Sequence, residues 1–185
     1  MKSLLVALSI FSLTACGGST PPAEEAPPAV EKAPVKAEAA APAVEEAPKA
    51  AVNVVTDDGA VATVALTGND MMQYNAKEIT VAAGRTVKLT LTHTGAMPAS
   101  AMGHNFVLLK PGTDAMAFAA AGAAAQATDY ISPDHADKVI AQTKLVGGGE
   151  SDTIEFAAPA PGTYEFICTF PGHSAIMRGT FTVTE

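Results

Sequence analysis

The 185-residue chain has no tryptophan, only two cysteines and charged side chains at only 16% of its positions. It has no phosphate-cradling glycine motif and no basic patch, and its formal net charge is −8. An acidic surface repels a phosphate backbone, which argues against nucleic acid as a partner. The mostly apolar run at residues 4–13 is too short to span a bilayer as a helix. The two cysteines lie in contexts too different to suggest a disulfide framework.

Composition separates a long N-terminal region from one folded domain. Residues 19–51 contain seven of the 13 prolines and no aromatic side chain, so they have almost nothing to bury. We expect them to be disordered and extended. Their composition leaves open whether they are a passive spacer or bind a partner. Residues 52–185 hold nine of the ten Phe and Tyr side chains and are long enough for one sizeable core.

The first residues predict export from the cytoplasm. Lys2 precedes the apolar run at residues 4–13, and small residues come directly before Cys16, as in a secretory signal. The ending Leu-Thr-Ala-Cys resembles the lipobox of bacterial lipoproteins, in which cleavage precedes the cysteine and lipid is attached to it. We therefore expect a signal peptide at residues 1–15 and a lipidated Cys16 that opens a tether at residues 16–51. A plain signal peptide with a chance cysteine is the alternative.

The two residues after the cysteine bear on the choice of membrane. Gly17 and Gly18 lack the aspartate that retains lipoproteins in an inner membrane. The resemblance therefore favours the bacterial outer membrane, with residues 52–185 in the periplasm or at the cell surface.

Residues 52–185 have the pattern of short β-strands. Polar and apolar side chains alternate without interruption over residues 86–92, which indicates a strand with one buried face. Turns containing Gly or Pro separate the other expected strands, which are residues 61–66, 78–81, 104–109, 153–156, 164–168 and 179–183. The Ala-rich residues 114–127 are the one helical candidate. The pattern predicts an all-β, Greek-key sandwich or barrel with one short helical excursion.

Three metal-binding side chains occur within ten residues near the C-terminus. Cys168, His173 and Met177 follow each other at spacings of five and four, and a Pro-Gly turn would return His173 to the cysteine. A second imidazole would come from His104, which begins a different expected strand. One thiolate, two imidazoles and a weak thioether suit copper in electron transfer. The thiolate and nitrogen donors also suit Zn²⁺, for which a thioether is a poor structural ligand.

The unpaired cysteine needs a function. Cys168 has no disulfide partner once Cys16 carries lipid, and a free thiol in an oxidising compartment calls for an explanation. An enzyme with Cys168 as a nucleophile activated by His173 is one alternative. However, no orienting carboxylate is evident nearby, and Met177 would have no purpose. An adhesive or structural lipoprotein is another alternative. We expect no enzymatic activity.

Four motifs carry a family resemblance. They are Gly-Asn-Asp-Met-Met-Gln-Tyr-Asn at residues 68–75, Met-Gly-His-Asn at residues 102–105, Val-Ile-Ala-Gln-Thr-Lys-Leu at residues 139–145 with Gly147 to Glu150 soon after, and Cys-Thr-Phe-Pro-Gly-His-Ser-Ala-Ile-Met-Arg-Gly-Thr at residues 168–180. These motifs closely resemble those of the azurins, blue-copper proteins of the cupredoxin family. The match runs from about residue 62 to the end. With the lipobox and the Ala-Pro tether, the whole chain resembles the lipid-modified azurins of bacterial outer membranes.

The resemblance implies one copper ion that alternates between Cu(I) and Cu(II). His104 and His173 would supply ring nitrogens, and Cys168 the thiolate. Met177 would supply a weak axial sulfur, and Gly103 a carbonyl oxygen on the opposite axial side.

The resemblance also implies residues around the ligands. Asn105 and Phe170 would surround the site, with Asn105 tying the two ligand loops together and its region donating toward the cysteine sulfur. An uncharged docking patch would surround the edge of His173, which favours brief encounters. Its residues would be Met72, Met97, Met102, Pro171 and Gly172.

The implied function is one-electron transfer in a membrane-anchored protein. The implied partners are periplasmic redox proteins such as c-type cytochromes, nitrite reductase or cytochrome c peroxidase. The alternative is copper storage, delivery or protection with the same ligands.

The chain also departs from the family pattern. Ala62 and Arg85 occupy the positions of the azurin disulfide, and Phe106 replaces the tryptophan that usually follows Gly-His-Asn. His93 matches a partly buried azurin histidine that titrates without binding metal, and we expect His135 on a surface loop. We expect copper itself to stabilise a fold that lacks the disulfide.

Overall fold

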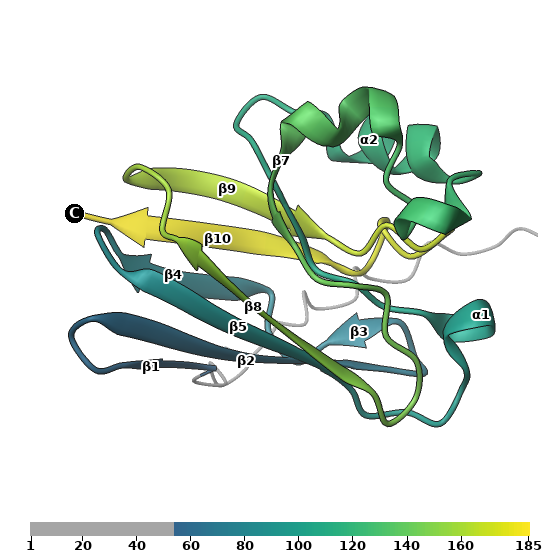
Figure 1. The fold of residues 1–185 in the computed structure, drawn as a ribbon, viewed down its shortest axis with the longest axis horizontal. Helices are drawn as coiled ribbons and strands as arrows, with labels where there is room; N and C mark the ends of the chain where they lie inside the picture. The colour runs from purple at the N-terminus through teal and green to yellow at the C-terminus, as the bar shows by residue number, and fades with distance from the viewer. Residues whose placement is uncertain (1–53) are drawn as a thin grey trace, which may run out of the picture. The chain divides into compact units, whose positions relative to one another are not determined.

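Two five-stranded β-sheets pack face to face in residues 54–185, the part of the chain that this computed structural model describes (Figure 1). The expected signal peptide, Cys16 and the tether at residues 16–51 lie outside the described residues. The first sheet has the order β1-β2-β5-β8, with β3 paired to β2. Its strands are β1 (Val55–Asp57), β2 (Val61–Asn69), β3 (Gln73–Tyr74), β5 (Thr86–His93) and β8 (Ser151–Ala157).

The second sheet has the order β4-β10-β9-β6-β7. Its strands are β4 (Glu78–Ala82), β10 (Arg178–Thr184), β9 (Gly162–Ile167), β6 (Val107–Leu109) and β7 (Val139–Gln142). Both sheets are mixed, because β2 pairs with β5, and β4 with β10, in parallel. The predicted all-β sandwich is therefore confirmed.

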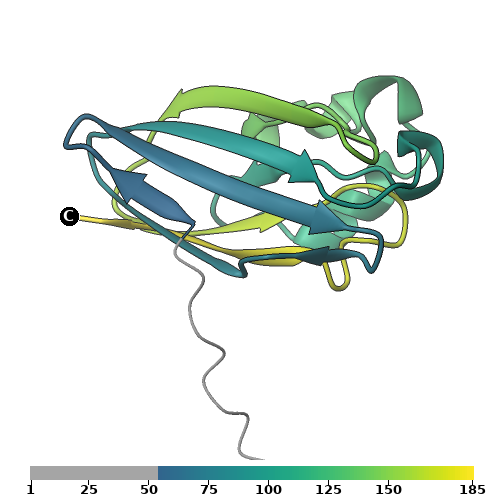
Figure 2. The ribbon, with the colours of Figure 1, turned by 90° about the horizontal axis from the view of Figure 1, so that it is seen from below.

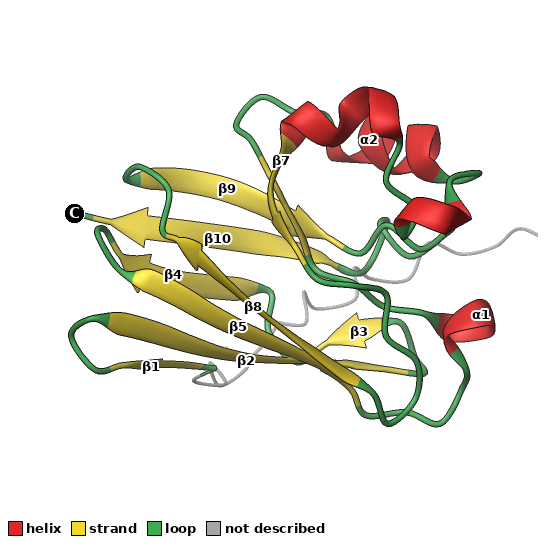
Figure 3. Cartoon of the chain, in the orientation of Figure 1, coloured by secondary structure: helices red, strands yellow, loops and turns green. Residues whose placement is uncertain are grey.

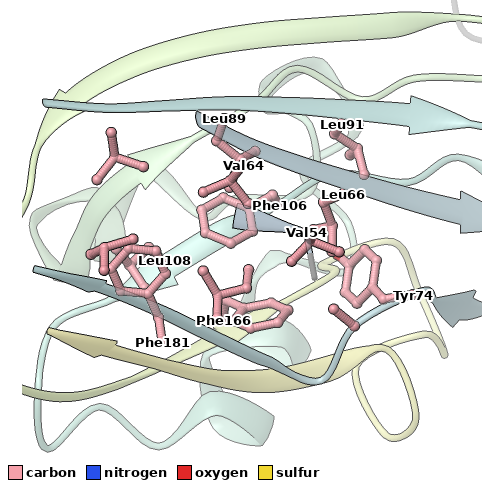
Figure 4. Close-up of a cluster of buried hydrophobic side chains, with 14 of the residues drawn as sticks. Val54, Val64, Leu66, Tyr74, Leu89, Leu91, Phe106, Leu108, Phe166 and Phe181 are labelled. Carbon is pink, nitrogen blue, oxygen red and sulfur yellow. The ribbon is translucent and has the colours of Figure 1, made fainter. Parts of the chain in front are cut away.

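The core fills the space between the sheets (Figure 4). Alternate side chains of β2 and β5 are buried, as the period of a strand with one inner face requires. Two leucines of the first sheet and two phenylalanines of the second meet in this core and are each 0% exposed: Leu66, Leu89, Phe166 and Phe181. This core provides a rigid base for the loops at its ends.

The helices gather at one end of the sandwich, away from the C-terminus (Figures 2 and 3). The predicted helix is shorter than expected: α2 is Ala115–Gly122, and two 3-10 helices follow it, η1 (Gln126–Thr128) and η2 (Pro133–Lys138). The Asp114 carboxylate caps α2 by accepting two backbone hydrogen bonds. Phe118 and Ile167 belong to a second buried cluster, which attaches α2 to β6 and β9.

Other boundaries also differ from the predicted pattern. The strand expected at residues 104–109 begins only at Val107, because His104 forms an isolated bridge with Val146 and the amide of Phe106 bonds to the Thr143 side chain. The short elements β1, β3, β7 and α1 (Ala99–Met102) were not predicted. None of the helices found in residues 54–185 is both long and apolar enough to cross a membrane.

The positions that lack the family disulfide have different roles here. Ala62 is completely buried in β2. The Arg85 guanidinium lies 3.2 Å from the Asp57 carboxylate and also donates to the Gly59 carbonyl, so it links the β1–β2 turn to the start of β5. An exposed ion pair contributes at most about 1 kcal/mol, less than the roughly 2–4 kcal/mol typical of a disulfide.

Candidate metal centre

Three buried donors converge at the helical end of the sandwich. One ligand atom each from His104, Cys168 and His173 lies within 4.8 Å of the others. Cys168 directly follows β9, and His173 lies in the loop before β10. His104 comes from the segment before β6, so the site joins two separate parts of the chain. The structure therefore brings together the three side chains that the sequence pattern selected.

Internal hydrogen bonds give the loop at residues 168–177 its shape. The amide of His173 donates to the Phe170 carbonyl at 3.0 Å across a Pro-Gly turn, in which Gly172 has a φ of 84°. That positive φ at the third turn position is the mark of a type II turn, and glycine meets it without strain. The amide of Cys168 donates to the Met177 carbonyl at 2.9 Å and closes the loop. As a result, His173 Nδ1 lies 3.6 Å from Cys168 Sγ.

His104 leaves one ring nitrogen without a partner. Its Nε2 lies 2.9 Å from the Asn69 carbonyl, which only accepts hydrogen bonds, so Nε2 carries the proton and Nδ1 a free lone pair. Among the described residues, His104 Nδ1 is the one buried side-chain nitrogen or oxygen without a hydrogen-bond partner. An unsatisfied buried group costs about 1–3 kcal/mol, which a bound metal would remove. This nitrogen shows that the residues fit a metal.

Burial sets the protonation of all three donors. It raises the pKa of the Cys168 thiol to about 11. It also lowers the pKa of His104, and it lowers that of His173 to about 4 together with the neighbouring imidazoles His104 and His93. At neutral pH both imidazoles are therefore neutral and able to bind a metal. The thiol keeps its proton until a metal displaces it.

The two expected axial donors also lie at this site. Met177 is completely buried, and the Gly103 carbonyl is 3.8 Å from Cys168 Sγ. Gly68, in β2, makes room for the ligands, because a Cβ there would lie 2.7 Å from Cδ2 of His104 and 3.4 Å from the Met177 methyl. Sequence reasoning did not select Gly68. The signal that could have found it is a glycine inside a strand, which often marks a place where a ligand or another part of the chain approaches the backbone closely.

Asn105 connects the two ligand segments, as the family resemblance implies. Its buried side chain accepts from the Thr169 amide at 2.9 Å and donates to the Thr169 hydroxyl at 2.8 Å. It also donates to the Asp129 carbonyl at 3.0 Å. Backbone hydrogen bonds from Asn105 and Phe170 to the cysteine sulfur partly oppose the effect of burial on the thiol pKa. Thr169 and Asp129 were not predicted.

A tyrosine completes the surroundings of Asn105. The buried Tyr74 hydroxyl donates to the main-chain carbonyl of Asn105. Burial and the adjacent Cys168 raise the pKa of Tyr74 well above its usual value, so this hydroxyl keeps its proton. The motif at residues 68–75 contained Tyr74, but sequence reasoning gave it no role.

The other histidines stand outside the donor set. His93 is completely buried rather than partly so, and its ring stacks on His104 with centroids 4.4 Å apart. The prediction of a surface loop for His135 holds for the surface but not for the loop. His135 is partly buried in η2, with its ring 6.5 Å from that of Phe118.

Exposed apolar side chains occur in the loop that carries His173 and beside it. Of the predicted docking residues, Met97, Pro171 and Gly172 are exposed, whereas Met72 and Met102 are half-buried. The other large apolar side chains exposed in the described part are Met71, Met116 and Ile176. A groove of about 240 Å³ separates α2 from the loop and is lined in part by Met116, Phe170 and Pro171. Phe170 is half-buried and packs on His173 at 4.6 Å between ring centroids.

The fold and this donor set define a copper-binding cupredoxin. The sequence model described as copper binding proteins of the plastocyanin/azurin family matches residues 51–184, and the chain belongs to this family. Copper is therefore the metal that fits the His-Cys-His cluster.

Individual relatives agree with this assignment. The chain is 42% identical over 184 residues to outer membrane protein H.8 of Neisseria meningitidis serogroup C, covering 98% of this chain and 97% of that protein. It is 40% identical over 128 residues to azurin of Pseudomonas denitrificans, covering 67% of this chain and 99% of the azurin.

Solved structures show the same fold. An azurin from the obligate methylotroph Methylomonas sp. strain J is similar with a TM-score of 0.61 and 34% identity, covering 66% of this chain and 98% of the azurin. Auracyanin A, a blue copper protein from Chloroflexus aurantiacus, is similar with a TM-score of 0.61 and 34% identity, covering 67% of this chain and 99% of its own.

Proposed function

We propose that this chain is a one-electron carrier with a blue copper site. The observation that carries the proposal is the buried set His104, Cys168 and His173, in which one ring nitrogen of His104 has no partner. Bound copper would supply the one-electron change between Cu(I) and Cu(II).

The protein's own residues hold the donors in one arrangement. His104 and His173 present neutral nitrogens, and Cys168 presents a thiolate after losing its proton. Met177 and the Gly103 carbonyl would complete the set as weak ligands. The hydrogen bonds around Asn105 and within the loop limit rearrangement on electron transfer. Because all donors are buried, no open position is left for a substrate, and we propose that the protein is not an enzyme.

Electrons would pass through the edge of the site at His173. His173 is 3% exposed and His104 is 0% exposed. Pro171 and Gly172, next to His173 in the loop, are exposed and uncharged, and the exposed Met97 would extend this docking surface, which suits weak and brief docking. Partners of this class would be c-type cytochromes, nitrite reductase or cytochrome c peroxidase in the periplasm.

We further propose that a lipid on Cys16 anchors the chain in the outer membrane. The lipobox-like sequence before Cys16 supports this anchor, and the relative of similar length in Neisseria meningitidis is named an outer membrane protein. In a bacterial host, Cys16→Ser should abolish incorporation of labelled palmitate and release the chain from the membrane fraction. Cys168→Ser is the matched control and should remain membrane-bound. Equal labelling of both variants would contradict the anchor.

The decisive experiment is the optical and EPR spectrum of the Cys16→Ser chain loaded with Cu(II). An electron carrier should show an intense blue thiolate-to-copper band and a narrow copper hyperfine splitting, both lost reversibly on reduction. A pale spectrum typical of tetragonal copper, or the absence of stoichiometric binding, would overturn the proposal.

Copper storage, delivery or protection would use the same donors without cycling electrons. Cys168→Ser separates these functions. If electron transfer is lost while the histidines still hold copper, the carrier is supported. If the variant protects cells from copper as well as the unchanged protein does, the alternative is supported. His135→Gln, with its imidazole outside the donor set, is the control and should behave like the unchanged protein.

A further inference from the structure

Tyr74 joins the first sheet to the segment that carries His104. It lies in β3, is only 7% exposed, and packs its ring on Phe166 with centroids 5.7 Å apart. Its hydroxyl donates to the main-chain oxygen of Asn105, the residue that follows His104. A buried hydroxyl needs such a partner, and here the partner adjoins a ligand.

The Tyr74 hydrogen bond completes the bonding of Asn105. The Asn105 side chain is bonded to Thr169 and Asp129. Its backbone lies beside the Cys168 thiol and acts to lower the thiol pKa, against the effect of burial. The peptide group between Asn105 and Phe106 is held at both ends. Its oxygen accepts from Tyr74, and its N–H donates to the Thr143 hydroxyl at 2.9 Å. Tyr74 therefore fixes a peptide plane one residue from His104.

We propose that Tyr74 is a positioning residue of the copper site, which holds the Asn105 main chain against the Cys168 sulfur and so raises the reduction potential. The inference rests on the proposed function above. Donors directed at a thiolate stabilise its negative charge, and the reduced site carries one positive charge less than the oxidised site. A donor held in this direction therefore favours Cu(I). If the Asn105 main chain were held less firmly, the preference of the site for Cu(I) would be weaker.

Tyr74→Phe tests the inference, because it removes the hydroxyl and keeps the ring. Tyr164→Phe is a matched control: Tyr164 is 8% exposed, belongs to the same core, and donates to the Ala160 carbonyl at 2.6 Å. It lies in β9, toward the opposite end of the strand from Cys168. Both full-length variants should lose a similar amount of stability in the metal-free state.

Only Tyr74→Phe should lower the reduction potential and shift the thiolate-to-copper band. It should also speed amide exchange at Phe106 in the metal-free protein, a measurement that needs no copper. Equal potentials and equal Phe106 exchange in both variants would overturn the inference, as would a rise in potential confined to Tyr74→Phe. If the unchanged protein forms no blue site, the proposed function fails instead.

A measurement on the unchanged protein covers the case in which Tyr74→Phe does not fold. In the Cu(I) form, NMR should detect a slowly exchanging hydroxyl proton on Tyr74. Rapid exchange of that proton with solvent would overturn the inference.

Discussion

The imidazole of His93 lies flat against that of His104, with ring centroids 4.4 Å apart and an angle of 11° between the planes. Both nitrogens of His93 are already bonded. Nε2 lies 2.9 Å from the Met102 carbonyl, and Nδ1 accepts from the Gly95 amide at 3.0 Å. His93 therefore supports the ring of His104 from behind and is not itself free to bind metal.

Replacing His93 should cost stability and spare the metal site. His93→Phe keeps a flat ring but leaves the Met102 carbonyl and the Gly95 amide unpaired, so we expect a loss of about 1–3 kcal/mol in the metal-free protein. Urea unfolding measures this loss. The blue band should persist, and its loss from a variant that still folds would contradict a purely supporting role for His93.

Gly68→Ala should disturb the site directly. The new methyl would lie 2.7 Å from the His104 ring, closer than real Cβ contacts allow, so the ring must move. We expect weaker copper binding and a broadened or shifted visible spectrum, measured by titration with Cu(II).

Gly179→Ala is the control for that substitution. Its Cβ would lie 2.4 Å from the Lys77 carbonyl and from the Phe166 ring, so it should also destabilise the fold. Its spectrum should nevertheless stay near that of the unchanged protein. If both variants alter the spectrum equally, Gly68 has no specific role at the site.

The metal-free protein should lose stability as the pH falls from about 6.5 to about 4. The folded pKa of His173 is about 4 against an ordinary value of 6.5, so in this window the unfolded chain binds more protons than the folded chain. The His173 contribution is present above pH 6.5 and is lost as the pH approaches 4, amounting to roughly 1–3 kcal/mol.

Urea unfolding at several pH values checks this dependence. His104, whose pKa is also lowered, adds to the slope, so His173→Gln should flatten it without abolishing it. An unchanged slope in His173→Gln would mean that His173 does not titrate as burial predicts. The lowered carboxyl pKa values of Asp58 and Asp70 place their effects at still lower pH.

Copper should raise the melting temperature. A ligand that binds only the folded state stabilises it by about 2.7 kcal/mol at a hundredfold excess over its Kd. The effect matters here because Ala62 and Arg85 occupy the positions of the family disulfide. Calorimetry with and without Cu(II) should show a clear shift in the unchanged protein and in His135→Gln. Cys168→Ser should show a smaller shift, and a full shift in that variant would contradict thiolate ligation.

Local patterns in the sequence predicted the strands and the donors well. Alternation over residues 86–92 corresponds to β5, and the spacing of Cys168, His173 and Met177 corresponds to one closed loop. Both signals are local, because alternation and spacing act within a few residues. The late start of β6 was not predicted, because residues just before it bond elsewhere. The amide of Phe106, for example, donates to the distant Thr143 side chain.

The surroundings of the site could not be predicted in the same way. Gly68, Tyr74 and Asp129 each act on a ligand or on Asn105 from positions distant in the sequence. Their roles come from the way the two sheets meet, which no local pattern expresses. The partial burial of His135 was not predicted for a related reason, since its ring approaches Phe118 of α2 through tertiary packing.

The loop at residues 168–177 also affects when the protein can bind metal during folding. Cys168, His173 and Met177 lie within one self-bonded loop, whereas the Gly103 carbonyl beside Cys168 comes from 65 residues earlier in the chain. A chain whose sheets have not yet met therefore offers only part of the donor set. Tight metal capture would therefore be a late event that marks correct assembly of the two sheets.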